Sequence, residues 1–268
     1  MAGLKNTTIA GGYKSILRID DNTNGITSSV LAVTDGEGAK SCMLLSDDSL
    51  EVRPQNDNSS QTVNIMNNND DNILQVNTTS GIVRVNDGQE IANTQYAYFG
   101  VNYSDFSALS ANTHYTIPFS AASGGANLLN DVDFGTGTDP DTSFTCADTD
   151  SQYASQLVPM MWLVPDNITI DDIYAIVGAD AATGDAATRI HLFQYTFTSG
   201  SASALTSGSV IAHSTADTNN AGNEQAYKTT LTKDVTDIDA DKVILAFFRS
   251  DSVNSDYSIN ITVKYHLR

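Results

Sequence analysis

The chain has 268 residues, with 32 acidic and 13 basic side chains and a formal net charge of −19. Because phosphate binding needs clustered Lys and Arg, this balance argues against a nucleic-acid partner, and an anionic membrane surface would repel the chain as well. The sequence has no stretch of about 18 apolar residues and no signal-peptide core at its N-terminus, so we expect no membrane span and synthesis in a cytoplasm.

Residues 1–48 form a leading segment with three predicted strands, at residues 13–19, 28–33 and 39–45. The first two are joined through a turn cluster that contains Asn24-Gly25, and the third follows a second turn at residues 34–38. The first of the two cysteines, Cys42, lies in the third strand, and the second, Cys146, lies 104 residues later. In a reducing compartment we expect two free thiols rather than a disulfide.

Residues 49–94 repeat one short phrase four times, at residues 49–53, 62–66, 72–77 and 81–86. Each is a brief β-type run in which apolar residues alternate with polar ones, and turn-forming residues fill the gaps. These runs carry too few apolar side chains to enclose a core of their own, so the segment needs a partner surface. We expect that partner to be further copies of the chain, in an intertwined, fibre-like homotrimer.

The predicted threefold axis is lined by the apolar residues of the repeat, namely Val63, Ile65, Ile73, Val76 and Val83. Two alternatives are a single-chain solenoid and an ordinary antiparallel meander packed on the downstream domain.

Residues 95–268 carry longer runs and more aromatic residues, which predict strands at 96–101, 114–119, 157–164, 168–177, 189–197, 243–249 and 257–267. The last run alternates cleanly, as a strand packed on one side does. No comparable window has a helical period, so the sequence predicts a β-sandwich with jelly-roll connectivity. The long polar stretch 120–156 and the Ala/Gly/Asp-rich stretch 178–188 are expected to be loops or arms. Trp162, the only tryptophan, is expected in the core.

No catalytic constellation emerges from the sequence. His114, His191, His213 and His266 have no His or Cys at metal-ligand spacing, and neither a Gly-x-Ser-x-Gly nor a His-Glu-x-x-His motif occurs. Asp171 and Asp172 are expected to point to opposite faces of a strand, which argues against a shared acid/base site, although paired acids from separate strands stay open. We therefore expect a protein that is not an enzyme and needs no cofactor.

An acidic cluster at residues 130–141 alternates Asp with Gly, as calcium loops do. Its candidate ligands are Asp131, Asp133, Asp139 and Asp141, but the EF-hand order is missing, so a solvated acidic loop is preferred. Tyr153 and Tyr227 lie near predicted loops and are candidates for exposed sugar contacts, with nothing that singles them out.

Two parts of the chain resemble the surface proteins of tailed-phage particles. Residues 161–168, 173–177 and 242–251 with the final alternating strand are similar to the trimeric jelly-roll domain of fibre ends and capsid-decoration proteins. Residues 10–19, 34–41 and the repeat resemble shaft or base segments of phage virion proteins. The resemblance implies a homotrimer on the virion surface that is anchored by its N-terminal part, where Leu4, Tyr13, Ile16 and Leu17 are the candidate attachment residues.

Two virion roles compete under this resemblance. The sandwich begins within about ninety-five residues of the N-terminus, which favours a capsid decoration or cement protein bound to the major capsid protein. The alternative is a long receptor-binding tail fibre that recognises a host surface glycan. A non-viral carbohydrate-binding module is the second alternative. In each virion role the protein is made in the host cytoplasm and functions on the particle surface.

Overall fold

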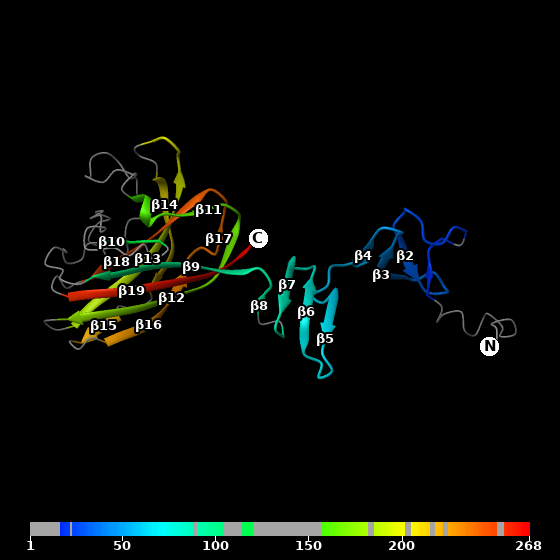
Figure 1. The fold of residues 1–268 in the computed structure, drawn as a ribbon, viewed down its shortest axis with the longest axis horizontal. Coiled ribbons are helices and arrows are strands. Elements are labelled where there is room, and N and C mark those ends of the chain that lie inside the picture. The colour runs from blue at the N-terminus through cyan, green and yellow to red at the C-terminus, as the bar shows by residue number, and fades with distance from the viewer. Residues whose placement is uncertain are drawn as a thin grey trace. The chain divides into compact units, whose positions relative to one another are not determined.

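The computed structural model describes residues 17–21, 23–87, 90–103, 114–119, 157–181, 185–201, 205–214, 218–221, 225–250 and 255–268. By its internal contacts the chain divides into two compact units, Met1–Asn93 and Thr94–Arg268. The described residues are dominated by β-strands, and their one helical element is the short 3-10 turn η3 (Val158–Met160). The chain is therefore all-β over these ranges (Figure 1).

The first small sheet is an antiparallel meander of β1 (Arg18–Ile19), β2 (Leu31–Thr34), β3 (Lys40–Leu45) and β4 (Leu50–Val52). Acidic side chains shape its turns. The Asp21 carboxylate accepts hydrogen bonds from the backbone N–H groups of Thr23 and Asn24, at 2.7 and 2.9 Å, ahead of Gly25 at φ +68°. Such local bonds compete with strand pairing and so end the strand there.

The second small sheet is an antiparallel meander of β5 (Val63–Met66), β6 (Asn72–Asn77), β7 (Ile82–Val85) and β8 (Glu90–Ile91). Three of the four predicted repeats form β5, β6 and β7, which pair with one another within the chain. The first repeat forms β4, which pairs with β3 and not with β5. The division between the two sheets thus lies between β4 and β5 rather than at residue 48.

The second unit is a β-sandwich that is nearly closed. One sheet has the order β9 (Thr94–Tyr103), β19 (Ser255–Leu267), β12 (Ile168–Ala181) and β16 (Gln225–Lys233). The other has the order β10 (His114–Ile117), β18 (Lys242–Ser250), β13 (Asp185–Phe197) and β14 (Leu205–Ser214). The shorter strands β11 (Trp162–Val164), β15 (Thr218–Ala221) and β17 (Asp237–Ile238) pair with β18, β13 and β12.

Two contacts bring the sandwich close to a barrel. On one side, β14 pairs with β16 and so joins the two sheets. On the other side, the Gly100 N–H donates to the Pro118 carbonyl at 3.0 Å, and Phe99 bridges to Phe119. Continuous pairing of this kind leaves few unpaired strand edges.

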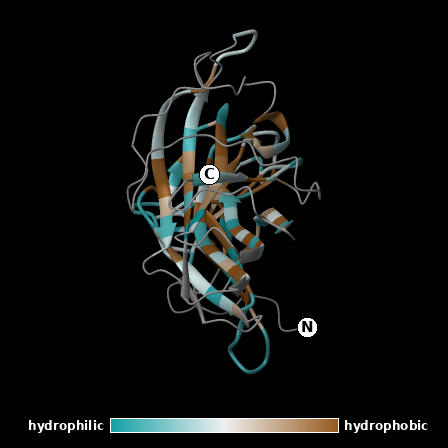
Figure 2. Cartoon of the chain, turned by 90° about the vertical axis from the view of Figure 1, so that its left-hand side faces the viewer, coloured by the Kyte–Doolittle hydropathy of each residue, from teal (hydrophilic) through white to brown (hydrophobic). Residues whose placement is uncertain are grey.

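The main core lies between the two sheets and consists of inward side chains at alternate positions of the strands, such as Ile173, Ala175 and Val177 on β12. Figure 2 shows this alternation as hydrophobic and hydrophilic bands along the strands. Trp162 is in the core, as predicted, with 6% of its surface exposed, and its ring stacks on Phe119 with centroids 5.8 Å apart. A second cluster, which includes Leu157, Phe193 and Phe247, lies on the opposite face of the β18/β13/β14 sheet.

Two sequence expectations about this unit are wrong. Most of the expected loop 178–188 is strand, because β12 runs to Ala181 and β13 begins at Asp185. Backbone pairing with β19 and β15 carries both strands through small residues that have no strong strand preference. The expected strand at 157–164 is divided, because Pro159 lies within η3 and only Trp162–Val164 pairs with β18. The predicted loop 120–156 lies outside the described residues.

Candidate functional site

One face of the second meander is entirely apolar across three strands. The pairing aligns Val63 with Val76, and Val76 with Val83, while Leu74 lies opposite both Ile65 and Val85. Side chains directly opposite in a sheet share a face. We call this set the repeat face: Val63, Ile65, Leu74, Val76, Val83 and Val85.

The repeat face is incompletely covered within one chain. Ile65 and Val83 are 51% and 36% exposed, and the other four residues are half-buried. The opposite face is mixed: it carries Asn64, Gln75 and Arg84, which are paired with one another in the same register, and also Met66, Ile73 and Ile82. The repeat face is therefore the more apolar side of the meander, and it is the side that a partner would cover.

Four of the five predicted axis residues lie on this face. The exception is Ile73, which is three residues from Val76 on β6 and therefore lies on the opposite face. Leu74 and Val85 join the face and were missed, although each is two residues from a predicted axis residue, Val76 or Val83, so strict alternation indicates both.

The first meander repeats the pattern. Leu31, Leu45 and Leu50 are aligned across β2, β3 and β4, and Met43 and Val52 form the next row of the same face. Leu50, Met43 and Val52 are all exposed. Both meanders of the first unit thus present an apolar face that their own strands do not cover.

Most of the predicted attachment and calcium residues lie outside the described residues: Leu4, Tyr13, Ile16, Asp131, Asp133, Asp139 and Asp141. Leu17 is described and is 74% exposed next to β1. Within the described ranges, no group of three or more His, Cys, Asp or Glu side chains is placed to hold a metal ion. Cys42 is an exposed free thiol on β3, and Cys146 is outside those ranges.

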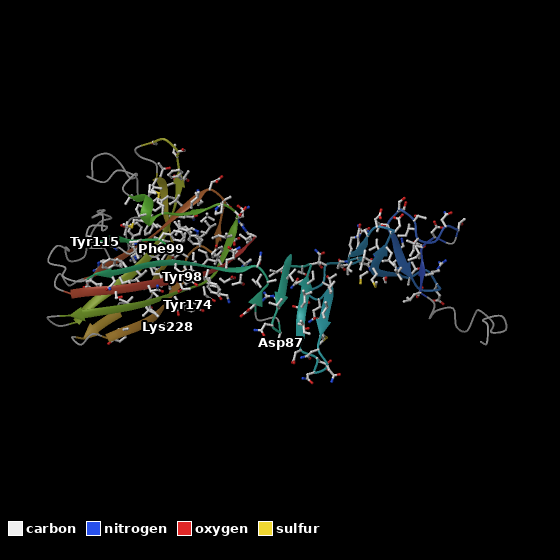
Figure 3. The ribbon with its side chains drawn as sticks, in the orientation of Figure 1. Asp87, Tyr98, Phe99, Tyr115, Tyr174 and Lys228 are labelled. Atoms are coloured by element: carbon white, nitrogen blue, oxygen red, sulfur yellow. The ribbon has the colours of Figure 1, made fainter. Side chains whose placement is uncertain are left out.

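A second surface of interest is the outward face of the β9/β19/β12/β16 sheet. Tyr98 on β9 and Tyr174 on β12 lie in one row, on either side of Thr262 on β19. The next row begins with Tyr96, which is opposite Lys264. Tyr96 and Tyr98 are 51% and 48% exposed, and Figure 3 labels Tyr98, Tyr174 and Lys228 on this sheet. We call the surface around the three tyrosines Tyr96, Tyr98 and Tyr174 the tyrosine face.

Neighbouring side chains hold Tyr174 in place. The Lys228 ammonium lies 4.8 Å from the centre of its ring, in a cation–π contact. Partial desolvation, together with the nearby Asp172 carboxylate, raises the pKa of the Tyr174 hydroxyl above 10.0. The hydroxyl therefore stays protonated at neutral pH and can donate a hydrogen bond.

Asp171 and Asp172 both point outward, so the expectation that they occupy opposite faces is wrong. A register shift between Ile170 and Asp172 inserts one residue, and Ile170 and Ile173 on either side both point into the core. Asp171 pairs with His266 at 3.0 Å, and the Lys233 ammonium lies 3.8 Å from Asp172 and also donates to the Asp171 carbonyl. The bulge thus places a polar cluster beside the tyrosine face.

The remaining histidines are parts of the sandwich. His114 and His191 are buried with ring centroids 5.2 Å apart, and His213 is paired with Asp234 at 2.8 Å. Of the tyrosines that the sequence suggested, Tyr227 is half-buried on β16 opposite the inward Val177, and Tyr153 lies outside the described residues. Among the described residues, no helix is long and apolar enough to cross a membrane.

Comparison with known proteins finds no matching family model and no matching curated protein. Among solved structures, the chain is similar to a crystal structure of an aminopeptidase from the marine sediment archaeon Thaumarchaeota archaeon, with 8% identity and a TM-score of 0.32. That similarity covers 72% of this chain and 40% of the aminopeptidase chain, so it spans well under half of the larger protein.

Proposed function

We propose that this chain is a homotrimeric structural protein of a tailed-phage particle, bound to the major capsid protein as a decoration of the virion surface. The repeat face is the observation that carries the proposal. Six aliphatic side chains gather on one side of a meander that has no core of its own. Further copies of the same chain would cover all of them at once, because a symmetric assembly repeats one self-complementary contact.

The apolar area to be covered favours an assembly of copies over a single chain. A fully buried aliphatic side chain contributes about 1.5–3 kcal/mol relative to an exposed one, so six half-exposed residues in each of three chains add up to a substantial driving force. The exposed apolar row of the first meander adds to the same tendency. A two- to four-stranded sheet of this size needs such help to be stable.

The strand order of the second unit supports jelly-roll connectivity. Eight main strands form two four-stranded antiparallel sheets, and chain-adjacent strands such as β12 and β13, or β18 and β19, belong to opposite sheets. A double-sheet arrangement of eight strands built from two Greek keys has this property. The sandwich has its own core, so it can be displayed outward while the first unit makes the assembly and attachment contacts.

Light scattering coupled to size-exclusion chromatography tests the assembly step. A folded species with three times the chain mass of 28.6 kDa supports the proposal, and a monodisperse folded monomer overturns it. Copy number in purified particles tests the location. A number that follows the capsid lattice supports decoration, whereas a number that follows the tail symmetry assigns the protein to the tail.

A further inference from the structure

We propose that the tyrosine face is a binding site for an oligosaccharide chain. The inference goes beyond the proposed virion role and stands apart from it, because every residue involved lies in the sandwich and none belongs to the repeat face.

The spacing of the three tyrosine rings suits a ligand that is a chain of sugar rings. Strands are about 4.8 Å apart and residues two apart on a strand are separated by about 6.7 Å, so the backbones at Tyr98 and Tyr174 are about 10 Å apart and those at Tyr96 and Tyr98 about 7 Å. A single sugar ring covers one aromatic ring, so three rings at these separations accommodate several consecutive sugars. Aromatic side chains offer an apolar face to the C–H groups of a sugar and, in tyrosine, a hydroxyl at the edge.

The residues between the rings are short and polar, and they keep the platform open. Thr262 separates Tyr98 from Tyr174, and the adjacent row contains Gly100 and Asn260. Neither a threonine nor a glycine rises high enough to block a ligand that rests on the rings. The Asn260 amide and the threonine hydroxyl can both donate and accept, as sugar hydroxyl groups require.

Tyr174 is also held in place before any ligand arrives. Lys228 packs on the ring of Tyr174, and Asp172 interacts with its hydroxyl. The Asp172 carboxylate is itself within 3.8 Å of the Lys233 ammonium, and Asp171 is paired with His266. Groups that are already ordered lose little entropy on binding, which raises affinity for a given set of contacts.

Other occupants fit the composition less well. The centres of protein–protein interfaces are enriched in Tyr but depleted in Lys and Asp, whereas the rows around these tyrosines contain Lys228, Lys264 and Asp172. A nucleic-acid strand would need a cationic groove that tracks its phosphates, and here the Asp172 carboxylate lies among the lysines of a chain with a net charge of −19. Ile176, at 52% exposure, adds apolar contact beside Lys228 without converting the face into a hydrophobic patch.

The test is a binding measurement on the full-length protein with a panel of purified hexasaccharides of the cello-, xylo-, manno- and alginate series, together with O-chain fragments from lipopolysaccharide. Saturation-transfer NMR identifies binders at millimolar concentration, and calorimetry then measures the affinity of the best one. We expect Tyr98→Ala and Tyr174→Ala each to weaken binding by about tenfold or more, as loss of one stacking contact does. Tyr98→Phe keeps the ring and should retain most of the affinity.

The matched control is Phe197→Ala, which removes an aromatic side chain that is 41% exposed at the end of β13, in the other sheet. It should leave the affinity unchanged. Light scattering on the same samples separates this proposal from the virion assembly, because the tyrosine variants should keep the oligomeric state of the unmodified protein. The inference is overturned if no member of the panel binds, if Phe197→Ala weakens binding as much as Tyr98→Ala does, or if the tyrosine variants dissociate the assembly, which would make the face a subunit interface.

Discussion

Replacing Val76 by Asn tests the central element of the proposed assembly. Val76 lies in the middle of the repeat face, with Val63 opposite it on one side and Val83 on the other. The substitution keeps the volume of the side chain nearly constant but replaces its methyl groups with an amide. In the homotrimer, three amides would then be placed where the faces meet.

The expected loss of association free energy follows from the apolar burial that each chain loses. Removing one valine from an apolar contact costs about 2 kcal/mol for each chain, or about 6 kcal/mol for the trimer. At 1.4 kcal/mol for each factor of ten, the equilibrium constant for trimer dissociation should rise by about 10⁴. Sedimentation velocity over a dilution series measures this directly, as a shift of the trimer-to-monomer transition to higher protein concentration.

The control is Gln75→Asn, which introduces the same residue at the adjacent position on the opposite face, where Gln75 is paired with Asn64 and Arg84. It reproduces the poor strand propensity of Asn without touching the apolar contact. Thermal unfolding of the sandwich should be unchanged in both variants, because its core lies in the other unit. If Val76→Asn dissociates at the same concentration as the unmodified protein, or if Gln75→Asn dissociates equally, the repeat face does not hold the copies together.

Further predictions concern the core, the tyrosine face and the particle. Trp162→Ala should destabilise the sandwich by about 3–5 kcal/mol in chemical denaturation, because it leaves a cavity beside Phe99 and Phe119; a loss below about 1 kcal/mol would contradict this packing. The raised pKa of Tyr174 means that its folded form holds a proton that the unfolded form releases above pH 10, so stability should fall as pH rises from there. Tyr174→Phe should reduce that slope in alkaline unfolding curves, and an unchanged slope would contradict this role of Tyr174. Deleting residues 1–48 should leave the sandwich folded by circular dichroism but abolish binding to stripped particles; wild-type occupancy would assign docking to the sandwich instead. Particles that lack the protein should assemble and then release DNA at a lower temperature than complete ones, whereas equal heat stability with failed adsorption to cells would favour a receptor-binding fibre.

The sequence alone was sufficient to locate many strands of this protein, although it did not predict β14 and β16. Alternation of apolar and polar residues placed the strand at 257–267 almost to the residue, and it located three strands of the repeat with their turns. These features are local, because a strand that is buried on one side needs a period of two whatever its partner is. The predicted core position of Trp162 was confirmed as well, since a large apolar side chain within a continuous apolar run is expected to be buried in the core.

Only the tertiary structure decided which faces those strands form. A bulge at Asp171 turned two adjacent carboxylates to the same side, and strand pairing aligned Leu74 with Ile65 and Val85 on the repeat face. Tyr98 and Tyr174 share a row only because β19, from the end of the chain, is inserted between β9 and β12. Strand neighbours of this kind depend on pairing between distant segments and on bulges that shift the register, and neither leaves a periodic mark in the sequence. Alternation therefore predicts that a residue points outward, and the fold determines which other residues it meets there.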